Sequence, residues 1–406
     1  MTTVIPYENY RDSMDRWLGE LPGHWATPAL GQVVRIRNGS DYKQIETDDA
    51  ASYPVIGSGG PFARATEYLY DRPTVLLGRK GTIDRPLYWD GPFWAVDTMF
   101  YTEISDQVEP RFLYYFSMRI DFKFYSTNTA LPSMASSDLR AIRFALPPLD
   151  EQRQIAEYLD RETGKIDELI AKQEQLVATL TERVTALWAN RIDLLTAHYP
   201  TVSIRRVISS IVDGPFGSSL TSAHYSDEGA RVIRLGNIGI FTFKDVDVAY
   251  VPLEYALELS AHAVLAGDVV VAGLGDDKMP LGRAAVVPET LGIALVKADC
   301  YRIRPNGQVS PEYMAWALSS PQLREQFKVL SRGSTRQRLN TAVVREATIP
   351  LPPRVEQDHA VEQFTRESEQ TGQLVLKATK VVEMLRERRA ALISAAVTGK
   401  IDVRGL

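Results

Sequence analysis

The chain has 406 residues, which suits two or three domains better than one hydrophobic core. Hydrophobic residues make up 45% and charged residues 24%, as in soluble globular proteins, and no apolar run approaches the ~20 residues of a membrane span. A single cysteine, Cys300, excludes an internal disulfide framework, and the five histidines lack metal-ligand spacing. The net charge of −5 argues against a protein that simply grips phosphates.

The N-terminal residues contain no apolar signal core, so we expect a cytoplasmic protein. Short apolar or β-branched runs punctuated by Gly, Pro and Asp follow over residues 30–145, and residues 202–350 have the same character. Helix candidates lie at Glu109–Ile120 and Pro311–Leu330. Strands mixed with a few helices and long loops predict an α/β or α+β fold for both regions.

Two segments of the chain are similar at a fixed offset of 205 residues. The motif Leu-Pro-Pro-x-x-Glu-Gln begins at Leu146 and again at Leu351, and the ungapped ranges 146–187 and 351–392 agree at sixteen of 42 positions. This level of internal agreement indicates a duplication, in the order domain, helix, domain, helix. The prolines end a strand before a helix begins, and the acid in the first turn suits the helix dipole.

Both copies continue into long helices after the prolines. Positions spaced alternately by four and three residues are mostly apolar in each copy, which predicts a heptad seam, and at ~1.5 Å per residue each helix would be about 60 Å long. The alternative is two ordinary amphipathic helices on separate cores. We expect the helix and partner interface at Ile155, Leu159, Ile166, Leu169, Leu176, Leu180 and Leu187, and at Phe364, Leu374, Val381, Leu385 and Leu392.

Three features together resemble the specificity subunits of Type I restriction–modification enzymes. The opening Tyr10–Trp25, with Trp-Leu-Gly-Glu-Leu-Pro-Gly-His-Trp, is similar to the leader of that family. The twice-used Pro-Pro-x-x-Glu-Gln before a long helix is similar to its two shared helical regions, and Leu392–Arg404, with Thr-Gly-Lys-Ile-Asp-Val-Arg, is similar to its C-terminal tail. The first helix departs from the tail pattern, because Trp188–Asp193 contains no Thr-Gly-Lys.

The resemblance implies a mixed α/β (α+β) fold of two similar globular target-recognition domains, separated by two long antiparallel helices in a pseudo-two-fold coiled coil. The expected segments are 1–149 for the first recognition domain, 150–199 for the central helix, 200–353 for the second recognition domain and 354–406 for the C-terminal helix. Both helices would serve as spacers and docking surfaces. Two readers of this kind suit half-sites roughly one helical turn, ~34 Å, apart on duplex DNA.

The resemblance also implies a function without chemistry in this chain. Each recognition domain would read one half of a bipartite double-stranded DNA target. Two modification subunits would bind along the helices, supply S-adenosylmethionine and methylate adenine N6. Restriction subunits, with ATP and Mg²⁺, would cleave the DNA. The chain itself would hold no cofactor and no metal, and it would have no membrane partner.

The DNA-contact candidates lie in polar or basic loops. Arginine forks suit guanine or phosphate, Asn and Gln suit adenine, and small residues let backbone amides approach phosphate. In the second half the candidates are Arg332, Ser334, Thr335, Arg336, Gln337, Arg338 and Asn340, with Lys278 and Arg283 in an earlier loop. In the first half they are Thr127, Asn128, Thr129 and Ser133, with Arg79, Lys80 and Arg85 in a Gly-flanked loop. A solvated basic loop or a tight turn with incidental charge would account for the same residues.

Signatures of a self-contained enzyme are missing from the sequence. It has no Gly-x-x-x-x-Gly-Lys-Ser/Thr loop for ATP and no Gly-x-Ser-x-Gly elbow for a serine nucleophile. Leu146-Pro147-Pro148 lacks the polar first residue and closing aromatic of adenine methyltransferase motifs. A nuclease or DNA methyltransferase complete in one chain is therefore the alternative to a specificity subunit rather than the leading hypothesis.

Overall fold

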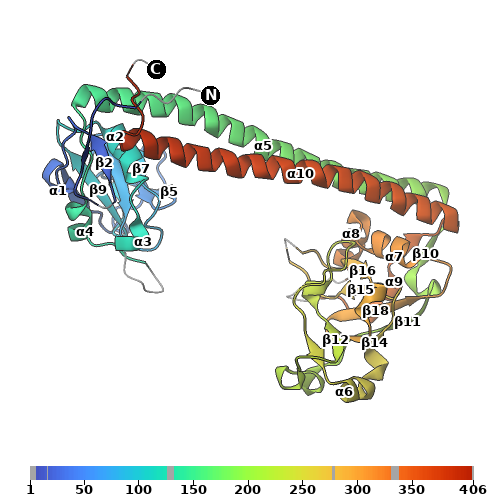
Figure 1. Cartoon of the computed structure of the whole chain (residues 1–406). Helices are drawn as coiled ribbons and strands as arrows, with labels where there is room; N and C mark the ends of the chain where they lie inside the picture. Colours follow the sequence, from blue (N-terminus) through green and yellow to red (C-terminus); the bar gives the residue numbers. More distant parts are fainter. Residues whose placement is uncertain (1–5, 16, 126–131, 277–278, 331–337, 405–406) are drawn as a thin grey trace. The chain divides into compact units, whose positions relative to one another are not determined.

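The computed structural model describes residues 6–15, 17–125, 132–276, 279–330 and 338–404 (Figure 1). The chain folds as two compact units: unit 1 comprises Met1–Glu174 with Thr379–Leu406, and unit 2 comprises Gln175–Ala378. Two long helices, α5 (Leu149–His198) and α10 (Arg354–Val397), contribute to both units. Each unit therefore consists of a globular part and one half of each long helix.

The globular part of unit 1 is built mainly from antiparallel strands. Sheets are formed by β3-β9-β6-β7, by β5-β4-β8 and by β1-β2, with a parallel pairing between β4 and β8. The strands are β1 (Tyr10–Asp12), β2 (Glu20–Pro22), β3 (Val34–Asn38), β4 (Tyr53–Gly57), β5 (Gly60–Ala65), β6 (Thr74–Gly78), β7 (Leu87–Trp89), β8 (Trp94–Ala95) and β9 (Met99–Ile104). The helices are α1 (Leu30–Val33), α2 (Pro110–Ser117), α3 (Phe122–Tyr125) and α4 (Ser136–Ala141).

Unit 2 has the sheets β11-β18-β15-β16, β13-β12-β17-β14 and β10-β19. The strands are β10 (Thr201–Ser203), β11 (Ile208–Val212), β12 (Ala230–Ile233), β13 (Tyr250–Val251), β14 (Ala263–Val264), β15 (Val269–Ala272), β16 (Ala284–Val286), β17 (Ala294–Val296), β18 (Cys300–Pro305) and β19 (Thr348–Pro350). The α-helices are α6 (Leu253–Glu258), α7 (Pro311–Leu318), α8 (Pro321–Leu330) and α9 (Thr341–Glu346). Short 3₁₀ helices span Ile204–Arg206, Gly217–Ser219, Ser222–His224, Leu235–Asn237, Ser260–His262 and Glu289–Leu291.

The two globular parts share one topology. The order β3-β9-β6-β7 recurs as β11-β18-β15-β16, with antiparallel neighbours throughout. The parallel pair β4 and β8 recurs as β12 and β17. The repeat that the sequence reveals in the long helices therefore extends through the globular parts, and the predicted mixed α/β class with two domains linked by long helices is confirmed.

The glutamine of the repeated motif joins each globular part to a long helix. In unit 1, Gln152 Oε1 accepts from the backbone N–H of Glu109 (2.8 Å), and Nε2 donates to the carbonyls of Gln107 (2.9 Å) and Pro147 (2.8 Å). Because Glu109 precedes the first residue of α2, this contact places the start of α2 against α5. We call this arrangement the glutamine clamp.

Unit 2 repeats the glutamine clamp atom for atom. Gln357 Oε1 accepts from Ser310 N (2.9 Å), and Nε2 donates to the carbonyls of Gln308 (3.0 Å) and Pro352 (2.9 Å). Both glutamines are fully buried. The helix-start interpretation of the motif holds for the prolines, but the glutamine has the further role of joining two elements far apart in sequence.

The long helices run antiparallel within each unit. In unit 1, Arg386 pairs with Glu174 at 2.7 Å and Arg389 pairs with Asp167 at 2.8 Å, so a later residue of α10 faces an earlier residue of α5. In unit 2, Trp188 of α5 lies 4.5 Å from Phe364 of α10 between ring centroids, and the later Arg191 donates to the earlier Gln363. Figure 1 shows α5 in green and α10 in red. The predicted antiparallel direction is therefore observed in both units.

The heptad seam is only partly correct. Of the predicted interface residues, Ile155, Leu159, Ile166 and Phe364 are buried, and Leu180, Leu187, Leu385 and Leu392 are half-buried. The remaining four stay 40–51% exposed: Leu169, Leu176, Leu374 and Val381. Those four positions leave apolar surface open on the helices, and their place in a partner interface stays a prediction.

The burial of α10 follows one of the two lines of the predicted seam. Phe364, Thr371 and Ala378 are buried at a spacing of seven residues. On the other line, Leu374 and Val381 are exposed. A straight helix has ~3.6 residues per turn and drifts against the 3.5 residues of a strict heptad, so part of the predicted seam turns away from the buried side.

The leader and the C-terminal tail meet in unit 1. Glu151, 5% exposed, accepts from the Tyr7 hydroxyl (2.5 Å) and from Trp25 Nε1 (3.0 Å), and His24 Nε2 lies 2.8 Å from its other oxygen. The Arg404 guanidinium from the tail lies 5.0 Å from the Tyr7 ring centroid. We call these five residues the terminal cluster. It joins the two segments that carry the family resemblance at the ends of the chain.

A glycine fits the tail tightly against the leader. Gly399 has a φ of +65°, and a Cβ atom there would lie 2.3 Å from Pro22 Cδ. Its carbonyl also accepts from the Tyr10 hydroxyl at 2.9 Å. A side chain at position 399 would be strained by the left-handed backbone and would clash with the ring of Pro22. The glycine of Thr-Gly-Lys is therefore required here for steric reasons.

The environment of Tyr7 predicts that the free energy of unfolding of the chain declines at alkaline pH. Burial, and then the hydrogen bond to Glu151, raise the pKa of its phenol well above the ordinary value near 10. The folded chain keeps a proton that the unfolded chain releases, so the contribution of Tyr7 is intact below about pH 10 and falls by ~1.4 kcal/mol per pH unit above it. Thermal unfolding between pH 9 and 11 should therefore decline more steeply for wild type than for Tyr7→Phe. Equal slopes would contradict this assignment.

Candidate nucleic-acid interface

Four loops of unit 2 converge near Asp299, just before the first residue of β18. The Leu274 backbone forms a bridge with Arg338, and Leu339 N donates to the Gly273 carbonyl at 2.9 Å. Gly273 N in turn donates to the Asp299 carbonyl at 2.7 Å. The two loops that the sequence singles out in this half are therefore adjacent. We call this region, with the loop 213–217 described below, reading face 2.

Unit 1 brings the counterpart loops together by the same backbone bonds. Lys80 forms a bridge with Ser133, and Met134 N donates to the Arg79 carbonyl at 2.9 Å. Arg79 N donates to the Thr98 carbonyl at 2.8 Å. This region is reading face 1. The correspondence between the two pairs of loops, expected from sequence offset, thus agrees with the backbone pairing.

The described DNA-contact candidates on reading face 1 differ in how exposed their side chains are. Lys80 and Arg85 are exposed. Arg79 is half-buried, because its guanidinium donates to the Asp97 carbonyl (3.2 Å) and lies 5.9 Å from the Phe100 ring centroid. Lys80 and Arg85 therefore present the accessible positive charge of this loop, and Arg79 also braces the loop against the sheet.

Arg283 is a correction to the predicted DNA-contact set. Its side chain is 4% exposed, and its guanidinium donates to five backbone carbonyls. Those carbonyls belong to Leu235, Ile238, Leu274, Met279 and Pro280. Burial lowers the pKa of Arg283, because desolvation disfavours the charged guanidinium. Arg283 shapes the loop beneath the reading face and is not available to DNA.

Two further candidates in unit 2 have roles within the protein. The Asn340 side-chain oxygen accepts from Val343 N at 2.9 Å, so Asn340 caps α9. Arg338 is half exposed, and its Nε lies 2.7 Å from Asp299 Oδ1. The expected adenine contact by Asn340 thus competes with capping, whereas Arg338 stays accessible while its position is fixed.

The remaining candidates lie outside the described residues. They are Thr127, Asn128 and Thr129 in unit 1, and Lys278, Arg332, Ser334, Thr335, Arg336 and Gln337 in unit 2. Their roles in DNA binding stay predictions.

Sequence reasoning missed the aromatic Phe216 and the basic Lys297 beside reading face 2, and it offered Arg234 only as a weaker candidate. Phe216 is 51% exposed, with the Arg338 guanidinium 5.4 Å from its ring centroid. Lys297 and Arg234 lie 5.5 and 5.9 Å from the Tyr225 ring. Phe216 belongs to a Gly-Pro-Phe-Gly run, and the glycines identify a loop without revealing that its ring is exposed.

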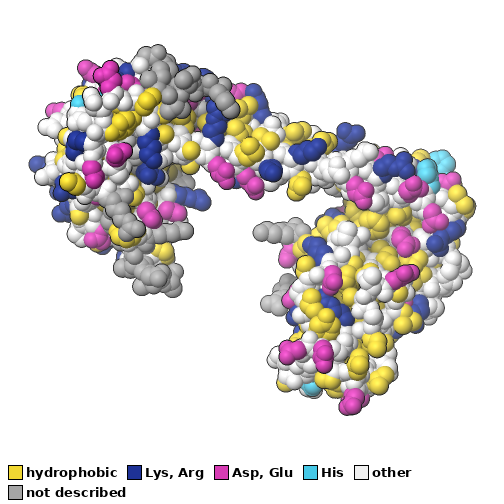
Figure 2. All heavy atoms as spheres, in the orientation of Figure 1, with side chains coloured by type: hydrophobic (Ala, Val, Ile, Leu, Met, Phe, Trp, Pro, Cys, Tyr) yellow, Lys and Arg dark blue, Asp and Glu magenta, His cyan; other side chains and the backbone are white. Residues whose placement is uncertain are grey.

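Charges of both signs are interspersed over each unit, as Figure 2 shows for the visible face. The negative total therefore does not prevent local positive character such as that of Arg338, Lys297 and Arg234. Phosphate attraction depends on the cations that face the backbone. The net charge of −5 is thus compatible with a local DNA-contact surface.

Among the described residues, no group of three His, Cys, Asp or Glu side chains is placed to hold a metal ion. Cys300 is fully buried, and burial raises the pKa of its thiol, which disfavours the reactive thiolate. Of the described helices, none combines the length and apolar character needed to cross a membrane.

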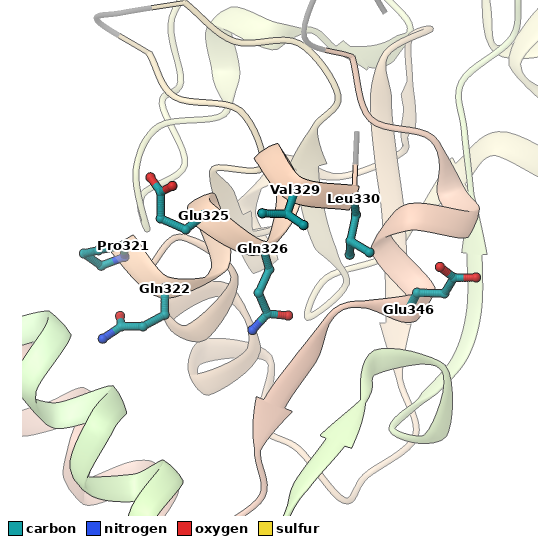
Figure 3. Close-up of a pocket in the computed structure, with 7 residues that line it drawn as sticks. All are labelled: Pro321, Gln322, Glu325, Gln326, Val329, Leu330 and Glu346. Carbon is teal, nitrogen blue, oxygen red and sulfur yellow. The ribbon is translucent and has the colours of Figure 1, made fainter. Parts of the chain in front are cut away.

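A groove of about 680 Å³ lies between α8 and α9 (Figure 3). Its lining consists of Pro321, Gln322, Glu325, Gln326, Val329, Leu330 and Glu346. Gln326 exchanges hydrogen bonds with the Thr348 backbone (2.9 and 3.0 Å), and Gln322 donates to the Ala189 carbonyl of α5. These glutamines join α8 to β19 and α5, and the lining residues do not pair a nucleophile with a base.

Comparison with known proteins gives one consistent result. Residues 22–178 match the model of the Type I restriction modification DNA specificity domain. The specificity subunit of the Type I restriction enzyme MjaVIII from Methanocaldococcus jannaschii is 21% identical, and the alignment covers 95% of each chain. The chain is thus similar to Type I restriction specificity subunits over nearly its whole length. The EcoBI specificity subunit of Escherichia coli is also 21% identical, over 83% of this chain and 77% of its own length.

A solved structure shares the fold of this chain. A chain from a structural study of complex assembly and conformational transition in the type I R-M system has a TM-score of 0.64 and 16% identity. The match covers 93% of this chain and 98% of that chain. At this identity the similarity shows a shared fold, and it includes the long helices as well as the globular parts.

Proposed function

We propose that this chain is the DNA sequence-specificity subunit of a Type I restriction–modification complex that works in the cytoplasm, and that it reads a bipartite target. Each unit reads one half of the target through its own reading face. The observation that carries the proposal is the duplication of these faces on one topology with different side chains: Lys80 lies opposite Ser133 in unit 1, and Leu274 lies opposite Arg338 in unit 2. Similar frameworks with different contact residues suit two unlike half-sites.

The subunit itself performs no chemistry in this proposal. Modification subunits, two of them, bind along α5 and α10, carry S-adenosylmethionine and methylate adenine N6. Restriction subunits use ATP and Mg²⁺ to cleave. The exposed Leu169, Leu176 and Leu374 on the long helices support the docking role, because exposed apolar side chains on a helix favour a protein partner.

The deciding experiment expresses the complete set of subunits in cells and maps adenine methylation. We expect a split motif that disappears when this chain is deleted. Methylation that persists unchanged after deletion, or no such motif in wild-type cells, would refute the proposal. The alternative, an enzyme complete in one chain, predicts that the purified chain alone cleaves or methylates DNA when given Mg²⁺, ATP and S-adenosylmethionine.

Arg338→Ala should weaken DNA binding by the assembled complex by about 1–3 kcal/mol, because a base-reading arginine contributes on that scale. Affinity for the mapped target, titrated at several salt concentrations, measures the effect. Lys328→Ala is the control, since Lys328 is exposed on α8 and pairs with Glu325 at 2.6 Å. If Arg338→Ala and Lys328→Ala bind alike, Arg338 does not read the target.

A further inference from the structure

Phe216 occupies a fixed position although its ring is exposed. The preceding Gly214 is pressed against the strand connection that leads into β18, where a Cβ atom would lie 2.0 Å from the Lys297 carbonyl carbon. Asp213 Oδ1 accepts from Gly214 N (2.7 Å) and from Asp299 N (3.1 Å). The loop is therefore fastened on both sides just before Phe216. The backbone that leads to Phe216 is thus held in place, and the ring lies half exposed beside the other loops of reading face 2.

Arg338 is fixed over the same ring from a different loop. Its guanidinium lies 5.4 Å from the Phe216 centroid, and its Nε lies 2.7 Å from the Asp299 carboxylate, which is 19% exposed. The following residue, Leu339, accepts the Tyr301 hydroxyl through its carbonyl. A carboxylate and an aromatic face thus restrict the arginine, and an arginine held this way loses less conformational freedom on binding.

Unit 1 repeats the close approach of the glycine but not the arginine. Gly39 is pressed against the connection into β9, where a Cβ atom would lie 2.0 Å from the Val96 carbonyl oxygen. An aromatic residue, Tyr42, again follows, but the cation over its ring is the adjacent Lys43, 4.7 Å from the centroid. The position that corresponds to Arg338 in the loop pairing is Ser133, so the pair of Phe216 and Arg338 is particular to unit 2.

We propose that Phe216 and Arg338 form a base-reading pair for the half-site of unit 2, in which Arg338 binds a guanine edge and Phe216 contacts the methyl group of an adjacent thymine. An arginine fork matches the O6 and N7 acceptors of guanine, and an apolar ring matches the thymine methyl group in the same groove. This inference rests on the proposed function, because it assigns bases to reading face 2.

The test uses the complex of this chain with its modification subunits and the target mapped by methylation. The half-site of unit 2 is the one whose base substitutions lose their effect in Arg338→Ala. Duplexes in which thymine is replaced by uracil, or guanine by 7-deazaguanine, remove one recognised group each. Wild type should discriminate against each replacement by about 5- to 150-fold in binding.

Each variant should lose one discrimination and keep the other. Phe216→Ala should bind thymine and uracil duplexes equally, and Arg338→Ala should bind guanine and 7-deazaguanine duplexes equally. Leu257→Ala, which removes a 74% exposed side chain of α6 in the same unit, is the control and should behave as wild type. Matching thermal unfolding curves confirm that the variants fold.

The outcomes separate this inference from the proposed function. If the half-site contains no guanine next to a thymine, or if Phe216→Ala still distinguishes thymine from uracil as wild type does, the base-reading pair is wrong while the specificity role survives. If the wild-type complex methylates no sequence at all, the proposed function fails and this inference fails with it.

Discussion

Gln357→Ala is expected to lower the melting temperature of unit 2 by roughly 10 °C. The side chain is fully buried and makes the three hydrogen bonds of the glutamine clamp, to Ser310 N and to the carbonyls of Gln308 and Pro352. Each buried backbone group left without a partner costs about 1–3 kcal/mol, so we expect a loss of about 4 kcal/mol in the free energy of unfolding. In a unit of this size 1 kcal/mol corresponds to about 2–4 °C.

Calorimetry of the full chain measures this effect and can separate the two units. Gln152→Ala should lower the transition of unit 1 by a similar amount, because its bonds are the same. Gln154→Ala is the matched control, since Gln154 is exposed on the same turn of α5. A Gln357→Ala protein as stable as Gln154→Ala would show that the clamp contributes nothing.

Glu151→Ala is expected to release the leader and the tail from unit 1. Removal of this buried carboxylate leaves the Tyr7 hydroxyl and Trp25 Nε1 without their acceptor, at a cost of about 4 kcal/mol. Hydrogen exchange should then lose protection in residues 7–25 and 399–404, while unit 2 exchanges as in wild type. Glu151→Gln retains an acceptor oxygen and should restore part of the protection.

The repeat provides a control for Glu151 at the equivalent motif position. Glu356 is exposed, whereas Glu151 is 5% exposed within the terminal cluster. Glu356→Ala should therefore leave both stability and exchange close to wild type. Equal effects at positions 151 and 356 would mean that the helix dipole, which both acids share, accounts for the contribution of Glu151.

Much of the framework could be predicted because the motif and the helical segment after it occur twice in the sequence. The offset of 205 residues locates both long helices, and the observed starts at Leu149 and Arg354 follow the paired prolines closely. The heptad pattern correctly places Thr371 and Ala378 on the buried side of α10. It does not reveal which of the adjacent apolar residues Val381 and Val382 is buried, because packing against a neighbouring element decides between them.

The reading faces were less predictable because a sequence shows which side chains are charged but not whether they point into the protein or toward solvent. Arg283 and Arg338 both lie in polar loops, yet the first is surrounded by carbonyls and the second lies half exposed over Phe216. The ring of Phe216 resembles any core aromatic until the loop is folded. The terminal cluster likewise depends on a contact between Tyr7 and Glu151, which are 144 residues apart.

Each glutamine clamp touches only main-chain atoms of the segment that it holds. Gln152 and Gln357 require an N–H and a carbonyl at the start of α2 or α7, and they place no demand on the side chains beyond. The clamps would therefore survive the exchange of a whole globular part between relatives. An exchanged part would still have to supply the side chains that pack on the helices, such as Trp316 against Trp188.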